Sequence, residues 1–374
     1  MKSPGPLAQT LSRLVGTGRG AIGLDLSAER LNIVQFDDAA EAPVLRAAAS
    51  IPYGVGREQL LADPKALRQL LREAFDSHGF KGRRVMTCLP ASELRIFPIS
   101  VALAPGQDEA AAVAADLRTR LGAELDTAVV DYMPIRGDDS APTQRDALVA
   151  LAPRDRVLAY LNALERAGLE VAALDIGPAA LARLIAQVNQ ADTRAEHPHT
   201  LALNFGRHRS HICVVWGRRL VLDREIEFSE QAVLNRVTRS LGVDETMAQR
   251  LLLEKGLGVD AQGSADDADI ARTLAEVLRP DFAALVAEVN KTLIYTASRS
   301  RGRGVDQVYL LGSAGRYPGV DRMMQSLLSI PVEVLNPFRV FRSPMAVGEL
   351  DRMRPIAGIA LACGLGLRGL RSHA

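Results

Sequence analysis

Two stretches of the chain repeat one pattern that could hold a phosphate group and a metal ion. In each, an apolar run ends in an acid or its amide, turns on small or polar residues and returns as a second apolar run. These stretches are residues 21–34, with Asp25, and residues 201–215, with Asn204. Backbone amides in such turns can cradle phosphates, and a carboxylate can hold Mg²⁺, mostly through bound water. The pattern predicts two phosphate-facing hairpins, one in each half of the chain.

A glycine-containing turn late in the chain predicts a third loop of the same site. Residues 308–315 form an apolar strand that runs into this turn. Glycine at such a turn lets a nucleoside approach the backbone closely. The three loops predict a site for ATP and Mg²⁺, with Asp25 as the metal ligand. Its residues are Asp25, Ser27, Asn204, Gly206, Arg207, Gly312, Ser313 and Gly315.

The same residues predict that this cleft is degenerate. Asn204 cannot supply the negative charge that helps to fix Mg²⁺ or to orient an attacking water, and Glu29 in the first turn would repel phosphate. Arg207 and the basic residues after it could compensate by binding phosphate directly. Alternatively, Asn204, Gly206 and Gly312 serve only their turns. We expect weak or absent ATPase activity, with an active ATPase as the alternative.

The composition excludes several classes of function. The 374 residues carry a net charge of +1, from 45 basic and 44 acidic residues, and only 4% are aromatic. Neither the charge nor the aromatic content favours a nucleic-acid partner. The longest small-apolar run, residues 356–367, is too short for a membrane span, which needs about 20 residues. Because the N-terminus lacks a secretory signal, we expect a cytoplasmic protein whose membrane association is peripheral.

The thiols and imidazoles show no metal-binding pattern. The three cysteines, Cys88, Cys213 and Cys363, lie far apart in apolar runs, so we expect buried thiols rather than disulfides or metal ligands. Four histidines fall between residues 197 and 211, but no cysteine or carboxylate near them in sequence completes a site.

The first half, residues 21–190, alternates strands with helices and contains an insert. Residues 1–20 predict a flexible segment, with an amphipathic contact to membrane or partner as the alternative. Asp63 and Gly79 mark the two ends of a first helix. Residues 92–168 predict a module of order β-α-β-β-α. A final helix begins near Pro178, with Asp175 as its expected cap.

The second half, residues 200–350, follows a polar boundary at residues 189–199 and also alternates strands with helices, which indicates the α/β class. A helical subdomain is expected at about residues 227–300, with a polar loop at 258–269 and an interruption at Pro280. The C-terminal segment, residues 351–374, predicts a last helix that returns to the first half.

Three further segments carry a resemblance to a known family. Residues 146–175 form a strand, a helix that ends E-R-A-G-L, and a strand that ends in Asp175. Residues 318–321 read P-G-V-D, residues 330–338 end N-P-F, and residues 357–368 contain A-C-G-L. In this order they resemble the PilM-like, actin-fold (ASKHA) proteins of type IV pilus assembly, which have relatives in MSHA-type pilus and type II secretion systems. The resemblance covers nearly the whole chain.

The resemblance implies a two-domain actin-like fold with the insert in the first half. It implies a scaffold, peripheral at the inner membrane, that binds the N-terminal cytoplasmic tail of a bitopic inner-membrane pilus protein similar to PilN. The tail would lie between the insert and the rest of the first half, where an extended peptide suits main-chain pairing and side-chain pockets. Self-association stays open.

Three other readings rank lower. Filament-forming, division-type actin homologues usually end in an amphipathic membrane helix, whereas this sequence stops at Ala374, directly after the last expected helix. A type II secretion protein of this fold would continue into a transmembrane span. A sugar or acid kinase would need a catalytic carboxylate in a substrate pocket, and no acidic pair at a useful spacing stands out.

Overall fold

The computed structural model describes residues 19–37, 42–104, 106–135, 144–191, 198–258, 265–299, 302–353, 356 and 358–370. The expected flexible segment 1–20 lies outside the described residues except for its last two, which already belong to the first strand. The polar boundary and the polar loop of the second half are described only in part. Residues 265–269, expected as loop, are helical.

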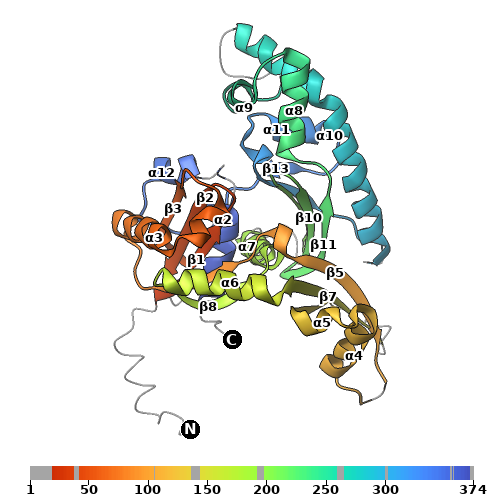
Figure 1. Ribbon diagram of the computed structural model, residues 1–374. Coiled ribbons are helices and arrows are strands. Elements are labelled where there is room, and N and C mark those ends of the chain that lie inside the picture. The colour runs from red at the N-terminus through yellow and green to blue at the C-terminus, as the bar shows by residue number, and fades with distance from the viewer. Residues whose placement is uncertain are drawn as a thin grey trace.

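Two five-stranded sheets of the same order form the two halves (Figure 1). In each, three antiparallel strands are followed by two parallel ones. The first sheet has the order β3-β2-β1-β4-β8: β1 (Arg19–Leu26), β2 (Arg30–Asp37), β3 (Val44–Pro52), β4 (Arg84–Cys88) and β8 (Glu170–Asp175). The second has the order β11-β10-β9-β12-β13: β9 (His199–Phe205), β10 (Ser210–Trp216), β11 (Arg219–Ile226), β12 (Gln307–Gly312) and β13 (Val332–Val334). Both predicted hairpins are confirmed.

One face of the first sheet is covered by α2 (Arg57–Ala62), α3 (Pro64–His78) and α6 (Arg154–Arg166). The predicted ends of α3 are confirmed. The Asp63 carboxylate accepts from the amides of Lys65 and Ala66, at 3.0 and 3.1 Å. Gly79 ends the helix in the left-handed region, with φ of 74°. Apolar residues one turn apart on α3 face the sheet, which is why this segment is a helix.

The other face is covered by α7 (Gly177–Ala191) and α13 (Ile359–Arg368), the two helices that connect the halves. They pack very closely, because a Cβ on Gly364 would lie 1.9 Å from the Ala180 carbonyl oxygen. The expectation that Asp175 caps α7 is wrong. Its carboxylate accepts from the adjacent Ile176 amide and pairs with Arg183 of α7 and Arg368 of α13. Asp175 therefore ties both connecting helices to the end of β8.

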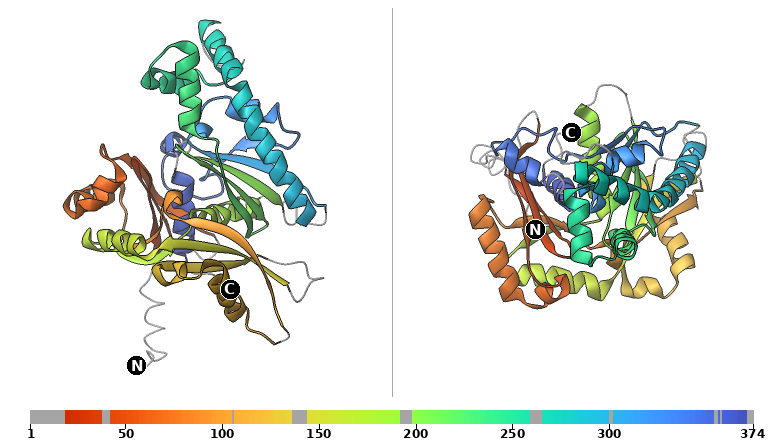
Figure 2. Two further views of the ribbon diagram at one scale, coloured as in Figure 1. Left: turned by 45° about the vertical axis from the view of Figure 1, so that its right-hand side comes forward. Right: turned by 90° about the horizontal axis from the view of Figure 1, so that it is seen from above.

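The insert has its own three-stranded sheet, ordered β5-β7-β6, from β5 (Arg95–Ala102), β6 (Ala128–Ile135) and β7 (Gln144–Pro153). Helix α4 (Glu109–Leu121) packs on one face of it. The opposite face contributes Ile96, Met133 and Leu148 to a cluster shared with Leu220 of the second half. Figure 2 shows this sheet extending away from the first half, beside the lower end of the second. The predicted order β-α-β-β-α is present, with a short α5 (Glu124–Thr127) added.

Helices α8 (Glu230–Leu241), α9 (Glu245–Glu254), α10 (Ala265–Arg299) and α11 (Val320–Gln325) pack around the second sheet and above it (Figure 1). The predicted interruption at Pro280 is wrong, since α10 runs straight through it. Leu278 and Phe282, on either side of the proline, are both fully buried. Their packing outweighs the loss of one backbone hydrogen bond. The short helices α2 and α12 (Val347–Met353) were not predicted, because so few residues show no clear periodicity.

Candidate functional site

A cavity of about 610 Å³ lies between the two halves. Its walls come from the turns of both hairpins, the ends of β4 and β12, and the starts of α7 and α13. Cavities outside the carboxyl ends of parallel strands are common ligand sites in α/β proteins. All eight residues predicted for the ATP and Mg²⁺ site line it: Asp25, Ser27, Asn204, Gly206, Arg207, Gly312, Ser313 and Gly315.

Asp25 is buried at the end of β1 and already has a partner. Its Oδ2 accepts a hydrogen bond of 2.9 Å from Asn32 Nδ2, and Asn32 Oδ1 accepts one of 2.6 Å from Ser50. Gly358, at the start of α13, presses on this pair, since a Cβ there would lie 2.5 Å from Asp25 Oδ2. Burial raises the pKa of Asp25 to about 6, although the Asn32 hydrogen bond and the charge of Arg57 favour the ionised form. This carboxylate is a poorer metal ligand than an exposed one.

The Ser27 hydroxyl closes the turn of the first hairpin. It donates to the Arg30 carbonyl oxygen at 2.9 Å and accepts from the Arg30 amide at 3.3 Å. The Tyr53 hydroxyl donates to the Ser27 carbonyl oxygen. Ser27 thus lines the cavity but its hydroxyl has a local partner.

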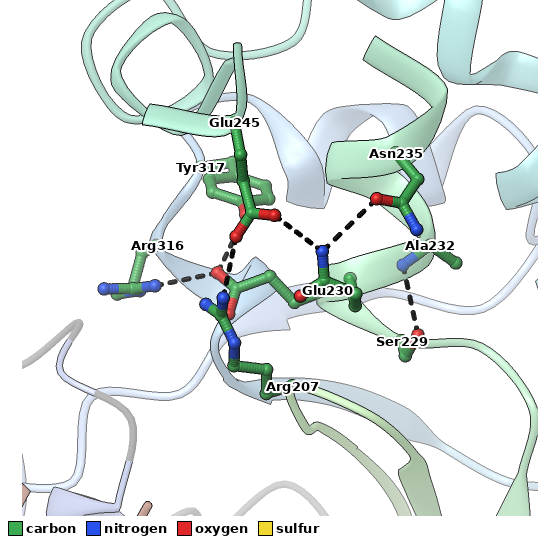
Figure 3. Close-up of polar contacts among 9 residues, drawn as sticks. Arg207, Ser229, Glu230, Ala232, Asn235, Glu245, Arg316 and Tyr317 are labelled. Carbon is green, nitrogen blue, oxygen red and sulfur yellow. Dashed lines mark hydrogen bonds and ion pairs between the residues drawn. The ribbon is translucent and has the colours of Figure 1, made fainter. Parts of the chain in front are cut away.

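The second hairpin is fastened to the start of α8. The amides of Glu230 and Gln231 donate to the carbonyl oxygens of Gly206 and Arg207, at 3.0 and 2.9 Å. Those helix amides are therefore used within the protein rather than pointed at a ligand. The Arg207 guanidinium pairs with Glu245 of α9 at 2.7 Å (Figure 3).

The third loop packs directly on the second hairpin. Gly312 has φ of 80°, and a Cβ there would lie 2.1 Å from the Phe205 carbonyl oxygen. The amide and hydroxyl of Ser313 both donate to that same oxygen, at 2.8 and 3.2 Å. Gly315 has more space, since its nearest neighbour would be 3.8 Å away. Gly312 is required by backbone geometry, whereas Gly315 is not.

A buried carboxylate that the sequence analysis missed stands at the centre of the second-half wall. Glu230 Oε1 accepts from Arg316 at 2.8 Å and from the Tyr317 hydroxyl at 2.9 Å (Figure 3). Only 3% of Glu230 is exposed. Burial and the Glu230 carboxylate raise the pKa of Tyr317, so its hydroxyl stays protonated and donates. The three residues join the start of α8 to the third loop. Their sequence separation leaves no local signal.

A second missed group lies on the cavity face of β10 and β11. Cys213 donates to Asp223 Oδ1 at 2.9 Å, and His211 Nδ1 lies 3.4 Å from Asp223 Oδ2. Burial of the His211 ring favours its neutral form, but the carboxylates of Asp223 and Glu225 outweigh this and raise its pKa. So an acidic pair does line the cavity. The alternation of residues 211 and 213 with 223 and 225 was the available signal, but it needed the strand register.

The residues of the cavity do not match what Mg²⁺ requires. The cation favours oxygen ligands with at least one or two well-placed carboxylates. Asp25 is bound to Asn32, Asn204 is neutral, and Glu230 is held by two donors. Within the described ranges, no three His, Cys, Asp or Glu side chains are grouped as a metal site would need. The expected buried thiols are confirmed at all three cysteines.

Comparison with known proteins identifies the family. A family model described as type IV pilus assembly protein PilM matches residues 23–370. A chain of the PilM-PilN type IV pilus biogenesis complex is similar, with a TM-score of 0.74 at 23% identity, covering 94% of this chain and 99% of that one. Ethanolamine utilization protein EutJ from Carboxydothermus hydrogenoformans has a TM-score of 0.51 at 13% identity, covering 93% and 89%. MreB5 of Spiroplasma citri bound to ADP has a TM-score of 0.46 at 12% identity, covering 94% and 96%.

These findings confirm the predicted fold and family. The relatives are proteins of the actin-like ATPase fold, and the two sheets of equal order seen here are the core of that fold. The family model leaves out only the two ends of the chain. The protein belongs to the PilM family of type IV pilus assembly proteins, as its sequence motifs indicated.

Proposed function

We propose that the protein is a scaffold of type IV pilus assembly that binds the N-terminal cytoplasmic tail of an inner-membrane protein similar to PilN. One observation carries this proposal, the likeness to a chain of a PilM-PilN complex that covers 94% of this chain and 99% of that one. A fold kept over its full length, insert included, supports the same kind of use. The proposal treats the cavity between the halves as a degenerate nucleotide cleft.

The insert and the first half offer a surface that suits an extended peptide. Within the described residues, β6 pairs with β7 alone, so its outer edge has main-chain groups for an added strand. Helix α6 lies beside β6, and Arg154 of α6 donates to the Ala128 carbonyl oxygen at 3.3 Å. Val129 of β6 and Leu158 of α6 are large apolar residues that are 41% and 51% exposed. We propose that the tail runs along this edge.

The insert is held firmly enough to present that edge. Arg57 of α2 pairs with Glu93, just before β5, at 2.8 Å, and donates to the Leu26 carbonyl oxygen at 3.0 Å. Its guanidinium also lies 5.1 Å from the centre of the Tyr160 ring of α6. One arginine therefore links the insert, the first hairpin and α6, and supports a fixed groove.

In this proposal the protein works in the cytoplasm and reaches the inner membrane through its partner. None of the helices in the described part of the chain has the length and apolar character of a bilayer-spanning segment. The partner would then supply the membrane anchor.

The groove is tested with a synthetic peptide of the PilN-like tail and charged variants of the protein. Val129→Asp and Leu158→Asp are expected to weaken binding about tenfold or more, because a charge enters an apolar contact. Val347→Asp, at a site on α12 that is 74% exposed, is the matched control and should bind like the unchanged protein. Equal affinity of all three variants would contradict the proposed groove.

A further inference from the structure

Three arginines reach the cavity from opposite sides. Arg30 belongs to the first half, and Arg207 and Arg316 belong to the second; all three line the same space. Guanidinium groups recognise phosphate oxygens with paired, directional hydrogen bonds. Three of them around one cavity are a natural receptor for a polyphosphate.

The two arginines of the second half are held by carboxylates of the helical subdomain. Arg207 pairs with Glu245 of α9, and Arg316 with Glu230 of α8, as Figure 3 shows. Glu245 is the more accessible partner, with 45% of its side chain exposed, whereas the Glu230 side chain is 4% exposed. Exposed ion pairs contribute little to stability, so the Arg207–Glu245 pair can exchange at low cost.

Arg30 sits close to Arg316 across the cleft. Its guanidinium donates to the hydroxyl and the carbonyl oxygen of Ser50, both at 2.8 Å, which fixes it without a counter-ion. Burial and the charge of Arg316 lower the pKa of Arg30, while the exposed Glu29 partly offsets this. An anion between the two arginines would relieve this repulsion and attract both halves.

We propose that the cleft binds a polyphosphate without a divalent metal ion, with Arg30, Arg207 and Arg316 as ligands and Glu245 as the exchangeable counter-ion of Arg207. The arginines supply the positive charge that a metal ion supplies elsewhere, which fits the poor set of metal ligands. When Arg207 turns to the anion, Glu245 loses its partner, so occupancy of the cleft reaches α9. This inference is independent of tail binding.

The test is calorimetric titration of the full-length protein with inorganic triphosphate in the presence of EDTA. Binding is expected under these conditions. Arg207→Gln should weaken it about tenfold, and Arg30→Gln likewise. Glu245→Gln should tighten it about threefold or more, because Arg207 is then free to turn to the anion. The double variant Arg207→Gln with Glu245→Gln should behave like Arg207→Gln.

The opposite signs separate this mechanism from general damage to the fold. Asp281→Asn, which removes the partner of Arg236 between α8 and α10, is the matched control and should leave affinity unchanged. Affinity for ATP within about threefold of that for triphosphate would support recognition through phosphates. ATP binding without triphosphate binding, binding that EDTA abolishes, or no tightening in Glu245→Gln would each overturn the proposal. The tail-peptide assay reads a different surface, so either proposal can fail alone.

Discussion

Asn32 donates a hydrogen bond of 2.9 Å to Asp25 across the first hairpin, between two side chains that are 0% and 6% exposed. The pair occupies the position where the sequence alone predicted a metal ligand. Its burial under Gly358 makes the carboxylate costly to ionise. The same atom arrangement that weakens Mg²⁺ binding therefore also sets a pH dependence of stability.

The first prediction concerns Asp25 and pH. The pKa of Asp25 rises from 3.8 to about 6 on folding, so the folded state binds the proton more tightly than the unfolded one. The stability linked to this group is fully present below pH 4 and is lost as the pH rises through 6. Asp25→Asn should therefore stabilise the protein by about 2 kcal/mol at pH 8 and by little at pH 4. Urea unfolding at both pH values measures this; a variant less stable than the unchanged protein at pH 8 would contradict it.

The second prediction concerns the third loop. Gly312→Ala should destabilise the protein by about 3 kcal/mol or more, because it forces a positive φ and a clash with the Phe205 carbonyl. Gly315→Ala is the control in the same loop, and it should change the stability by less than about 1 kcal/mol, since an added Cβ there makes only ordinary contacts. Thermal unfolding distinguishes the two. Similar losses for both would mean that the loop tolerates no side chain for some other reason.

The third prediction concerns the knot between the connecting helices. Asp175→Ala should destabilise the protein by about 2–3 kcal/mol, because it leaves Arg183 and Arg368 without their shared carboxylate. Asp126→Ala removes an ion pair whose two side chains are more than 60% exposed and should cost less than about 1 kcal/mol. Chemical denaturation of the two variants provides the comparison. A small effect at Asp175 would show that packing of α7 on α13 suffices alone.

The fourth prediction concerns Mg²⁺. In the unchanged protein, affinity for ATP should be the same with Mg²⁺ and with EDTA, and hydrolysis should be negligible. Asn204→Asp places a carboxylate on the cavity wall and should make ATP bind about threefold or more tightly when Mg²⁺ is present. Asn162→Asp, on the exposed side of α6, is the control. The prediction fails if the unchanged protein already requires Mg²⁺.

The sequence predicted the frame of this site well and its chemistry only in part. Both hairpins and the third loop follow from apolar runs with marked turns, so all eight candidate residues meet at one cavity. Glu230 and Arg316 were missed because they are 86 residues apart and pair only after α8 and the third loop have packed. The acidic pair of β11 was hidden in an ordinary strand pattern. Pro280 misled because tertiary packing overrode a local preference.

The central claim is that this protein binds a PilN-like tail as a scaffold, without depending on nucleotide hydrolysis. The most direct measurement is calorimetric titration of the full-length protein with the tail peptide in EDTA, without nucleotide. We predict saturable binding with a dissociation constant of about 1–10 μM, as an ordered groove and a short extended peptide would give. No binding at the highest peptide concentration, with or without Mg²⁺ and ATP, would contradict the claim.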